Sequence, residues 1–273
     1  MTHNLQGRTI VMSGGSRGIG LAILLAAARS GASAVLLAKT GQPHPRLPGT
    51  VHTAVEEITA AGGKAVAVVG DVRAEEDVER AVATAVTNFG GIDIVINNAS
   101  VLNLTGTADL TTKQFDLIQQ VNSRGTFLLT RAALPHLRNS ADPQVLTLSP
   151  PINLAPHWLG KFPSYMMSKY GMTLLTLGFA AELADLGIRA NCLWPQTTIA
   201  TSAVINLLGE SEAAKSRTPD IMADAAITLL TDPAKPTGRA LIDVDVLAAA
   251  GVTDLSGYGG TDHPELDFFV DPT

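Results

Sequence analysis

Short apolar runs alternate with longer helical stretches along most of this chain. Unbroken apolar runs predict buried strands, which we expect over residues 8–13, 33–39, 64–70, 92–97, 144–149 and 188–194. The stretches between and after them predict helices over residues 18–31, 50–63, 74–89, 111–138, 164–186 and 219–231. A further apolar segment follows at 239–247. This alternation indicates a single doubly wound α/β domain with a parallel sheet of about seven strands.

Two segments depart from this rhythm. Residues 40–49 contain three prolines and no apolar period, so they predict a loop inserted after the second strand. Residues 254–273 are interrupted by Gly and Pro but carry two phenylalanines and a valine, Phe268 to Val270, near their end. We therefore expect a domain over residues 1–253 and a C-terminal tail over 254–273. The apolar residues favour a tail docked on a pocket or a subunit edge over a disordered one.

Composition and charge narrow the class of protein. The chain has 273 residues, of which 46% are hydrophobic and 16% charged, which is enough for a large core. A net charge of −6 with no basic run argues against nucleic acid as a partner. The lone cysteine, Cys192, excludes an internal disulfide, and the six histidines show no metal-ligand spacing. Without a signal-peptide pattern or a run of ~18 apolar residues, we expect a cytoplasmic protein with no membrane span.

A glycine-rich turn, "SGGSRGIG", lies between the first predicted strand and the first predicted helix. Gly14 allows a sharp turn, Gly18 allows backbone to approach phosphates, and Gly20 allows the helix to pack closely on the strand. Free N–H groups at a helix start attract anions. The spacing differs from G-x-G-x-x-G, but the strand and helix on either side fit a pyrophosphate site. The predicted contacts in this turn are Ser13, Gly14, Ser16, Arg17, Gly18, Ile19 and Gly20.

The end of the second strand indicates which dinucleotide binds. An acidic residue about 20 positions after the turn would bond the ribose 2′-hydroxyl of NAD. Lys39 stands there instead, and Arg17 lies in the turn, so the pair favours the 2′-phosphate of NADP unless both point into solvent. The next strand ends supply further contacts to the adenine and ribose, since successive strand ends form one crevice. These are Asp71, Val72, Asn98, Ala99 and Ser100.

Tyr165 and Lys169 are one helical turn apart, so both side chains can face one ligand. A phenol has a pKa near ~10 and is a poor base, but a nearby ammonium favours the phenolate and lowers that pKa. The tyrosine could then donate a proton to a carbonyl oxygen as hydride arrives, or remove one in reverse. Lys169 could also bond the nicotinamide ribose.

Taken together, "SGGSRGIG", "NNAS" at 97–100, "VN" at 121–122 and "YMMSK" at 165–169 resemble the short-chain dehydrogenase/reductase family over nearly the whole chain. More narrowly, "AKTGQPHPRLPGT", "LSPPINLAP" and "LWPQT" resemble the hydroxysteroid dehydrogenase-like protein 2 group. The resemblance implies a Rossmann-type fold and a homodimer or homotetramer. Longer members of that group carry a sterol-carrier-like domain, which we do not expect here because the chain ends at residue 273.

The resemblance also implies a catalytic tetrad of Asn, Ser, Tyr and Lys. Asn122, Tyr165 and Lys169 match it, with Asn122 holding a water in the proton path through a bent helix. The family's serine usually stands about 13 residues before the tyrosine, and here that residue is Ile152. The loop after the sixth strand, which passes the nicotinamide carboxamide in the family, departs as well. It reads Pro-Gln instead of Pro-Gly, and its candidate contacts are Pro195, Thr197 and Thr198.

Two residues could hold the substrate oxygen in place of the missing serine. Ser149 ends the fifth strand, and the rigid turn at Pro150 could direct its hydroxyl into the crevice. Asn153 could supply an amide N–H if the loop folds back. Alternatively, Ser149 only bonds backbone at the turn, as serines often do. The catalytic assignment is therefore Tyr165, Lys169, Asn122 and Ser149.

These features predict an NADP-dependent oxidoreductase that interconverts a carbonyl and an alcohol. The apolar residues near the site favour a small apolar substrate of lipid, acyl or steroid-like character unless they are core or subunit contacts; they are Trp158, Phe162, Met166, Met167, Trp194 and Phe268. Reduction of a carbon–carbon double bond is a minor alternative. A protein that binds NADP with little or no turnover is the rival, which the Ser-Pro-Pro sequence favours and the intact tyrosine, lysine and asparagine oppose.

Overall fold

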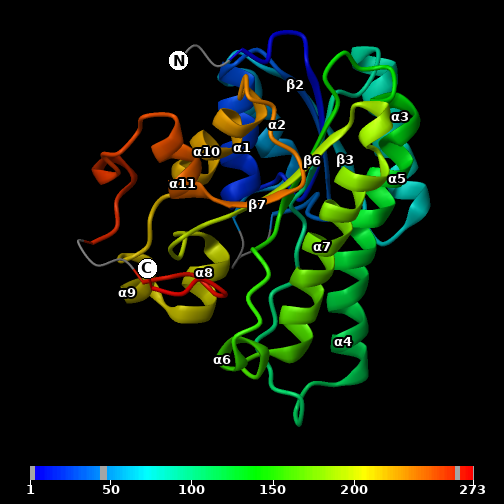
Figure 1. The fold of residues 1–273 in the computed structure, drawn as a ribbon. Helices are drawn as coiled ribbons and strands as arrows, with labels where there is room; N and C mark the ends of the chain where they lie inside the picture. The colour runs from blue at the N-terminus through cyan, green and yellow to red at the C-terminus, as the bar shows by residue number, and fades with distance from the viewer. Residues whose placement is uncertain (1–3, 44–47, 262–264, 273) are drawn as a thin grey trace.

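The computed structural model describes residues 4–43, 48–261 and 265–272. Within these ranges, seven parallel strands form one twisted central sheet in the order β3-β2-β1-β4-β5-β6-β7 (Figure 1). The strands are β1 (Thr9–Ser13), β2 (Ser33–Ala38), β3 (Lys64–Val69), β4 (Ile94–Asn97), β5 (Gln144–Leu148), β6 (Arg189–Trp194) and β7 (Arg239–Ile242). The predicted doubly wound sheet is confirmed.

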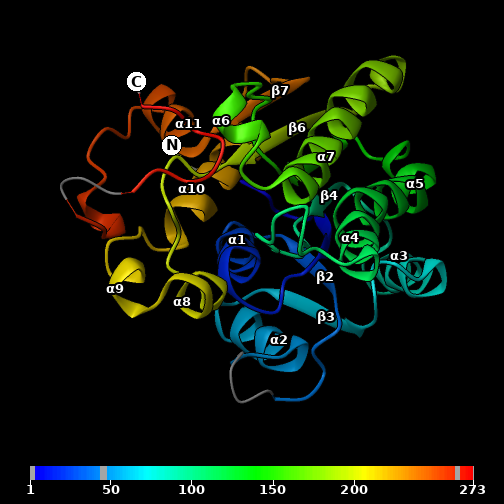
Figure 2. The same cartoon turned by 90° about the horizontal axis from the view of Figure 1, so that it is seen from below.

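Helices cover both faces of the sheet because its strands are apolar on both sides (Figures 1 and 2). One face carries α1 (Gly18–Arg29), α2 (Val51–Ala60), α10 (Asp220–Leu230) and α11 (Asp243–Ala249). The other carries α3 (Glu75–Phe89), α5 (Gly125–Leu137) and α7 (Pro163–Glu182). Each face has its own buried cluster of aliphatic side chains, and the scarcity of aromatic residues lets the helices pack closely on the strands.

The long helix predicted over 111–138 is interrupted. It consists of α4 (Thr112–Gln119), a π-helical turn η1 (Gln120–Arg124) and α5. Residues 239–247 also divide, because β7 ends at Ile242 and α11 begins at Asp243. The helix predicted over 164–186 consists of α7 and the 3-10 turn η2 (Ala184–Leu186). Other short elements were not predicted; they are α6 (Pro156–Leu159), α8 (Ser202–Leu208), α9 (Glu210–Ala213) and η3 (Ser256–Tyr258).

Chain connectivity places the predicted motifs at one edge of the sheet. The strand order reverses between β1 and β4, which pair in parallel with Ser13 opposite Asn97. In an open α/β sheet, ligands bind at such a switch point, outside the carboxyl ends of the strands. Of the loop predicted over 40–49, residues 40–43 and 48–49 form neither helix nor strand, and residues 44–47 lie outside the described chain.

Candidate active site

The turn between β1 and α1 packs directly against the end of β4. Gly14 has a φ of +79°, and a Cβ atom there would lie 2.9 Å from the Cα atom of Ala99. A Cβ atom at Gly20 would lie 2.5 Å from the carbonyl oxygen of Gly14. Both positions require glycine, because a larger residue would force the turn away from its neighbours. The turn therefore has the close backbone approach that phosphate binding needs.

Hydrogen bonds hold this turn to the exit of β4. Ser13 Oγ accepts from the backbone N–H groups of Asn98 and Ala99, at 3.3 Å and 3.2 Å. The side-chain amide of Asn98 donates to the carbonyl oxygen of Gly14 at 2.6 Å. Ser13 and Asn98, predicted as cofactor contacts, thus shape the turn, and Ser16 is buried within it.

A cavity of about 510 Å³ opens beside the first turn of α1. The helix begins after Arg17, whose side chain does not cap it, so its first N–H groups are free of a side-chain cap. Eleven of the predicted contacts line this cavity: Gly14, Arg17, Gly18, Ile19, Gly20, Lys39, Asp71, Val72, Asn98, Ala99 and Ser100. Other residues that line the cavity were not predicted as cofactor contacts; they include Val101, Leu117, Val121, Thr201 and Ser202.

Lys39 and Arg17 both line this cavity, and Arg73 shares the carboxylate of Asp71 with Lys39. Lys39 Nζ lies 3.2 Å from Asp71 Oδ2, and Arg73 Nη2 lies 2.6 Å from the same oxygen. The Arg73 side-chain hydrogen bond is the main cause that lowers the pKa of Asp71 to about 2. Arg17 Nη2 donates to the carbonyl oxygen of Gly49 at 2.7 Å. Sequence reasoning missed Arg73, although its position two residues after Asp71 is a signal for a local ion pair.

Tyr165 and Lys169 lie together on α7, at the exit of β5. Both are buried, at 5% and 2% relative exposure. Lys169 Nζ donates to the carbonyl oxygen of Leu148 at 2.6 Å and lies 4.7 Å from the centre of the Trp194 ring. A carbonyl acceptor and an aromatic face both stabilise an ammonium. Lys169 is therefore fixed between β5 and β6.

The pKa of Tyr165 does not move in the predicted direction. Burial, and then the nearby carboxylate of Asp267, raises this pKa above its usual range, whereas the sequence predicted that Lys169 would lower it. Burial also lowers the pKa of Lys169 to about 7, although the Asp267 carboxylate opposes this. The sequence prediction is wrong for this arrangement, because the C-terminal tail covers both groups and excludes water from them.

Asn122 is fully buried in the π-helical turn η1. Its side-chain oxygen accepts from the N–H of Val101 at 2.7 Å, and its amide donates to Ser168 Oγ at 2.9 Å. Ser168 Oγ in turn donates to the carbonyl oxygen of Tyr165 at 2.7 Å. A π-helical turn shifts the backbone pairing and is common at functional sites. Two members of the predicted tetrad, Asn122 and Tyr165, are thus connected through Ser168, which the sequence did not single out, while Lys169 bonds Leu148 instead.

Ser149 lies at the end of β5 and is fully buried. Its N–H donates to the carbonyl oxygen of Thr147, and its hydroxyl has no hydrogen-bond partner among the described residues. The hydroxyl lies beside the thiol of Cys192, on the side of the sheet that faces α7. The geometry gives the hydroxyl no hydrogen bond among the described residues, but it lies close enough to the Cys192 thiol to oppose the rise in the pKa of that thiol, so the thiol is the group it now faces.

Asn153, the other candidate oxygen holder, is already engaged. Its side-chain amide donates to the carboxylate of Asp271 at 2.7 Å and to the carbonyl oxygen of Phe269 at 3.3 Å. Its backbone forms two hydrogen bonds with the hydroxyl of Tyr170. Asn153 therefore holds the C-terminal tail in this structure.

The tail also pairs with the loop after β6. Thr197 forms an antiparallel bridge with Leu266, and the N–H of Thr198 donates to the carbonyl oxygen of Glu265 at 3.0 Å. Pro195 and Thr197 are both buried, and the Thr197 hydroxyl has no hydrogen-bond partner among the described residues. The segment predicted to pass the nicotinamide carboxamide is thus covered by residues from the end of the chain.

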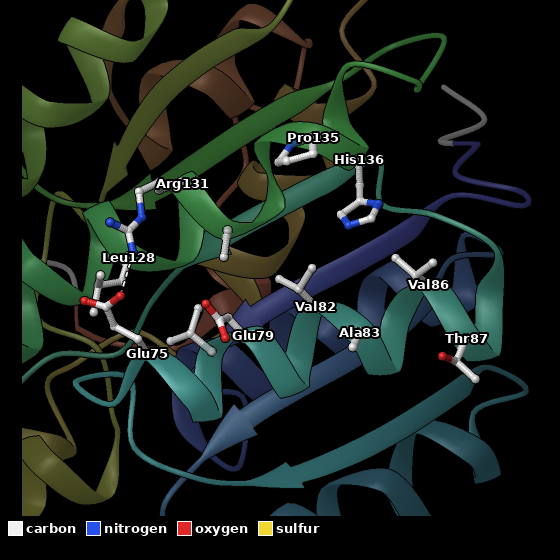
Figure 3. Close-up of a pocket in the computed structure, with 12 residues that line it drawn as sticks. Glu75, Glu79, Val82, Ala83, Val86, Thr87, Leu128, Arg131, Pro135 and His136 are labelled. Atoms are coloured by element: carbon white, nitrogen blue, oxygen red, sulfur yellow. Dashed lines mark hydrogen bonds and ion pairs between the residues drawn. The ribbon is translucent and has the colours of Figure 1, made fainter.

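Two further cavities lie away from these residues. Figure 3 shows one of about 450 Å³ between α3 and α5, where Arg131 pairs with Glu75 at 2.7 Å. The other, of about 770 Å³, is lined by α10, β7 and α11. Neither contains a predicted site residue, and the predicted catalytic residues Tyr165, Lys169, Asn122 and Ser149 are not in the lining of the 510 Å³ cavity either. Among the described residues, no helix is long and apolar enough to cross a membrane, and no His, Cys, Asp and Glu cluster could hold a metal.

Comparison with known proteins agrees with this geometry. The sequence pattern of the short chain dehydrogenase family matches residues 8–210. This chain belongs to the short-chain dehydrogenase/reductase family. It is similar to hydroxysteroid dehydrogenase-like protein 2 of Danio rerio, with 48% identity over 99% of the chain, and of Homo sapiens, with 45% identity over 99%. It spans 65% of the length of each of these relatives.

A solved structure shows the same likeness in three dimensions. A short chain dehydrogenase homolog from Mycobacterium thermoresistibile shares 49% identity and a TM-score of 0.93, covering 98% of this chain and 96% of that one. Members of the short-chain dehydrogenase/reductase family are oxidoreductases that bind a nicotinamide cofactor, NAD or NADP. The resemblance drawn from the sequence motifs is therefore confirmed at the level of the family and of this group.

Proposed function

We propose that this short-chain dehydrogenase/reductase uses NADP(H) to interconvert a carbonyl and an alcohol on an apolar substrate. The observation that carries the proposal is the set of buried Tyr165 and Lys169 on α7, with Tyr165 connected to Asn122 through Ser168, in a fold whose glycine turn has no room for larger residues. A protein that merely bound a nucleotide would need the turn but not the buried tyrosine and lysine. The set therefore favours turnover over binding alone.

The cationic residues near the end of β2 favour NADP over NAD as the cofactor. A ribose 2′-phosphate is dianionic, and Lys39 and Arg17 line the cavity, while Arg73 pairs with Asp71 and the neighbouring Asp77 pairs with Arg80. Lys39 is 65% exposed, so its ammonium is free to turn from Asp71 to a phosphate at small cost. Asp71 already accepts several hydrogen bonds from Arg73, which leaves less of its carboxylate for an adenine amino group.

The chain's own residues would move the proton in the following way. When bound, NADP(H) supplies or accepts the hydride. Tyr165 would donate its phenolic proton to the carbonyl oxygen during reduction and remove the alcohol proton during oxidation. Lys169, held by Leu148, would stabilise the phenolate that results. Ser149 would donate its free hydroxyl to the same substrate oxygen and align it with Tyr165.

The surroundings of Tyr165 favour an apolar substrate. A cluster of aromatic and aliphatic side chains packs around it, with contributions from the 102–104 loop, α6, α7 and the tail. Its buried members besides Tyr165 are Tyr170, Trp194 and Phe269. Apolar side chains of this kind bind lipid, acyl or steroid-like groups because binding removes apolar surface from water. The gain is about 25 cal/mol per Å² of apolar surface buried.

We further propose that the chain functions as a homodimer or homotetramer in the cytoplasm. Helix α7 packs against both α4 and α5. Large apolar side chains remain exposed on these three helices; they are Phe115, Phe127, Met167 and Leu174. A second copy packed against these helices would bury this surface. Sedimentation of the purified protein at several concentrations tests the proposal, and a monomer throughout would contradict it.

The test of the catalytic proposal is NADPH oxidation across a panel of ketones, 3-oxoacyl thioesters, enoyl thioesters and steroids. Oxidation with a ketone or 3-oxoacyl thioester is the expected result. Oxidation with enoyl thioesters alone would replace carbonyl chemistry by reduction of a carbon–carbon double bond. Tight NADPH binding without oxidation of any compound would support the rival, an NADP-binding protein without turnover, which the Ser-Pro-Pro sequence after β5 favours.

A further inference from the structure

The tail segment Glu265–Asp271 runs beside α6 (Figure 2), and its Phe268 and Phe269 rings contact the ring of Tyr165. It continues the pairing with the loop after β6, since the N–H of Asp267 donates to the carbonyl oxygen of Gln196 at 3.0 Å. The indole N–H of Trp194 donates to the carbonyl oxygen of Phe268 at 3.0 Å. These bonds occupy backbone and side-chain groups of the segment expected to meet the nicotinamide ring.

Phe269 fills an aromatic box next to the catalytic tyrosine. Its ring centre lies 6.2 Å from that of Tyr165, with the two planes 28° apart. The other walls are Tyr170 at 5.2 Å, Trp158 at 5.6 Å and Trp194 at 6.4 Å. Phe269 is 3% exposed and has a φ of +70°, a strained backbone conformation for a bulky residue. The favourable packing of its ring therefore holds the chain in an arrangement that the backbone disfavours.

Asp271 fastens the end of the segment outside the box. Its carboxylate accepts from Asn153 Nδ2 at 2.7 Å and Trp158 Nε1 at 2.8 Å, and lies 3.0 Å from His157 Nε2. These partners lie on the loop after β5 and on α6, so one carboxylate connects the tail to the opposite rim of the crevice. Loss of this carboxylate would release the end of the tail without altering Tyr165 or Lys169.

We propose that the segment Glu265–Asp271 is an intramolecular occupant of the substrate site and must leave it for turnover. This inference rests on the proposed function and deepens it. Phe269 stands where an apolar ring or chain end of the substrate would lie beside Tyr165. The site next to Tyr165 therefore takes an apolar group about the size of a benzyl side chain. Substrate and tail compete for the box, so the fraction of molecules with the tail displaced sets the apparent affinity.

The alternative is that the tail is a permanent wall that completes the substrate pocket. The burial of both reactive groups argues against it, because Tyr165 retains 5% exposure and Lys169 2% with the tail in place. A carbonyl oxygen needs contact with the phenol at about 2.6–3.2 Å for proton transfer. The ring of Phe269, itself 3% exposed and stacked 6.2 Å from the ring of Tyr165, occupies space beside the phenol ring that a substrate would need.

Two variants with a matched control test the proposal in the full-length protein. Asp271→Ala removes the outer anchor and Phe269→Ala removes the ring. Asp254→Ala is the control, because Asp254 is an exposed carboxylate at the start of the tail that accepts from Ser256, two residues away.

The chain has two tryptophans, and both donate hydrogen bonds to the docked segment. Acrylamide quenching of tryptophan fluorescence therefore reports release of the tail, and we expect it to rise in both variants and not in the control.

Binding of the apolar dye ANS measures occupancy of the box without any turnover. If roughly one wild-type molecule in ten has the tail displaced, complete release raises the apparent ANS affinity about ten-fold. Unchanged quenching and unchanged ANS affinity in both variants would overturn the proposal. The quenching and ANS measurements test release of the tail even if no form of the protein oxidises NADPH. A lack of NADPH oxidation would count against the proposed function and not against tail release.

Activity measurements distinguish a tail that competes with the substrate from a tail that forms part of the substrate pocket. With a ketone that the wild type reduces, we expect kcat/KM of Asp271→Ala to exceed that of the wild type and of Asp254→Ala. A fall in kcat/KM together with increased quenching would show that the tail builds the pocket, and would overturn the proposal. Among the described residues, the Asp271 carboxylate bonds Asn153, Trp158 and His157. A rise in kcat/KM would therefore come from release of the tail and not from a direct change to Tyr165 or Lys169.

Discussion

The side-chain amide of Asn122 donates to Ser168 Oγ at 2.9 Å, and this bond connects the π-helical turn to the helix that carries the reactive tyrosine. Ser168 stands between Tyr165 and Lys169 in sequence and bonds the carbonyl oxygen of Tyr165. The π-helical turn is thereby held to the backbone of Tyr165, which we propose as the proton donor.

Ser168→Ala tests this connection. The substitution leaves the buried amide of Asn122 without one acceptor, so we expect the free energy of unfolding to fall by about 1–3 kcal/mol. Urea denaturation of the variant and the wild type measures it. Ser168→Thr, which keeps the hydroxyl, should recover most of the loss. An unchanged free energy of unfolding in Ser168→Ala would show that another group accepts from Asn122.

Tyr165→Phe removes the transferable proton and keeps the ring. We expect NADPH to bind with unchanged affinity, because the nucleotide cavity does not include the phenol. Turnover should fall by ~100-fold or more, the range expected for loss of a general acid. Calorimetric titration measures the first quantity and NADPH oxidation the second. Retained oxidation would mean that a different group supplies the proton.

Much of this architecture could be predicted from sequence because it rests on local patterns. Unbroken apolar runs identified the strands, and the glycine turn and Tyr-x-x-x-Lys spacing identified two ends of the crevice. The π-helical turn at Asn122 was not visible, because one inserted residue barely alters helical periodicity over the whole stretch. The pairing of Thr197 with Leu266 was also beyond sequence reasoning, since it joins segments distant along the chain. The predicted pKa direction of Tyr165 was wrong because the sequence showed neither the burial of Tyr165 nor the approach of Asp267 from the tail, both of which raise this pKa.

Cofactor preference is tested by reversing the charge at Lys39. A charge-assisted bond to the 2′-phosphate is worth roughly 1.5–3 kcal/mol, or about 10- to 150-fold in affinity. Lys39→Asp should lose this preference for NADPH over NADH, as calorimetry with both cofactors would show. Lys64→Asp is the matched control, because Lys64 is exposed at the opposite, amino end of β3. Equal affinities for both cofactors in the wild type would contradict the NADP proposal.

Ser149→Ala and Asn153→Ala separate the two candidate oxygen holders. The Ser149 hydroxyl has no hydrogen-bond partner among the described residues, so its loss should cost little stability while lowering turnover by about 100-fold, as for an oxyanion donor. Asn153→Ala removes an anchor of the tail and should raise the accessibility of Tyr165. If Ser149→Ala retains full turnover with normal cofactor affinity while Asn153→Ala loses it, the assignment passes to Asn153.

Asp243→Asn tests a buried carboxylate beneath the loop after β6. Asp243 Oδ1 accepts from the N–H groups of Gln196 and Val244, both at 2.8 Å, and Oδ2 has no hydrogen-bond partner among the described residues. Burial raises the pKa of Asp243 from its ordinary value of 3.8 to about 6, although these two hydrogen bonds oppose the shift. Between those pH values the folded protein holds a proton that the unfolded chain has released. The contribution of Asp243 to stability is therefore full below pH 3.8 and is lost as the pH rises through 6.

An asparagine keeps the acceptor for both N–H groups and carries no charge at any pH. Asp243→Asn should therefore match the wild type at low pH and exceed its free energy of unfolding at neutral pH, by up to about 3 kcal/mol. Chemical denaturation of both proteins at acidic and neutral pH measures the difference. Asp245→Asn, at an exposed position two residues along α11, should show no such crossover. A neutral-pH loss of stability in Asp243→Asn would mean that the ionised carboxylate is stabilised by its surroundings, and the bonds to the loop after β6 would then depend on its charge.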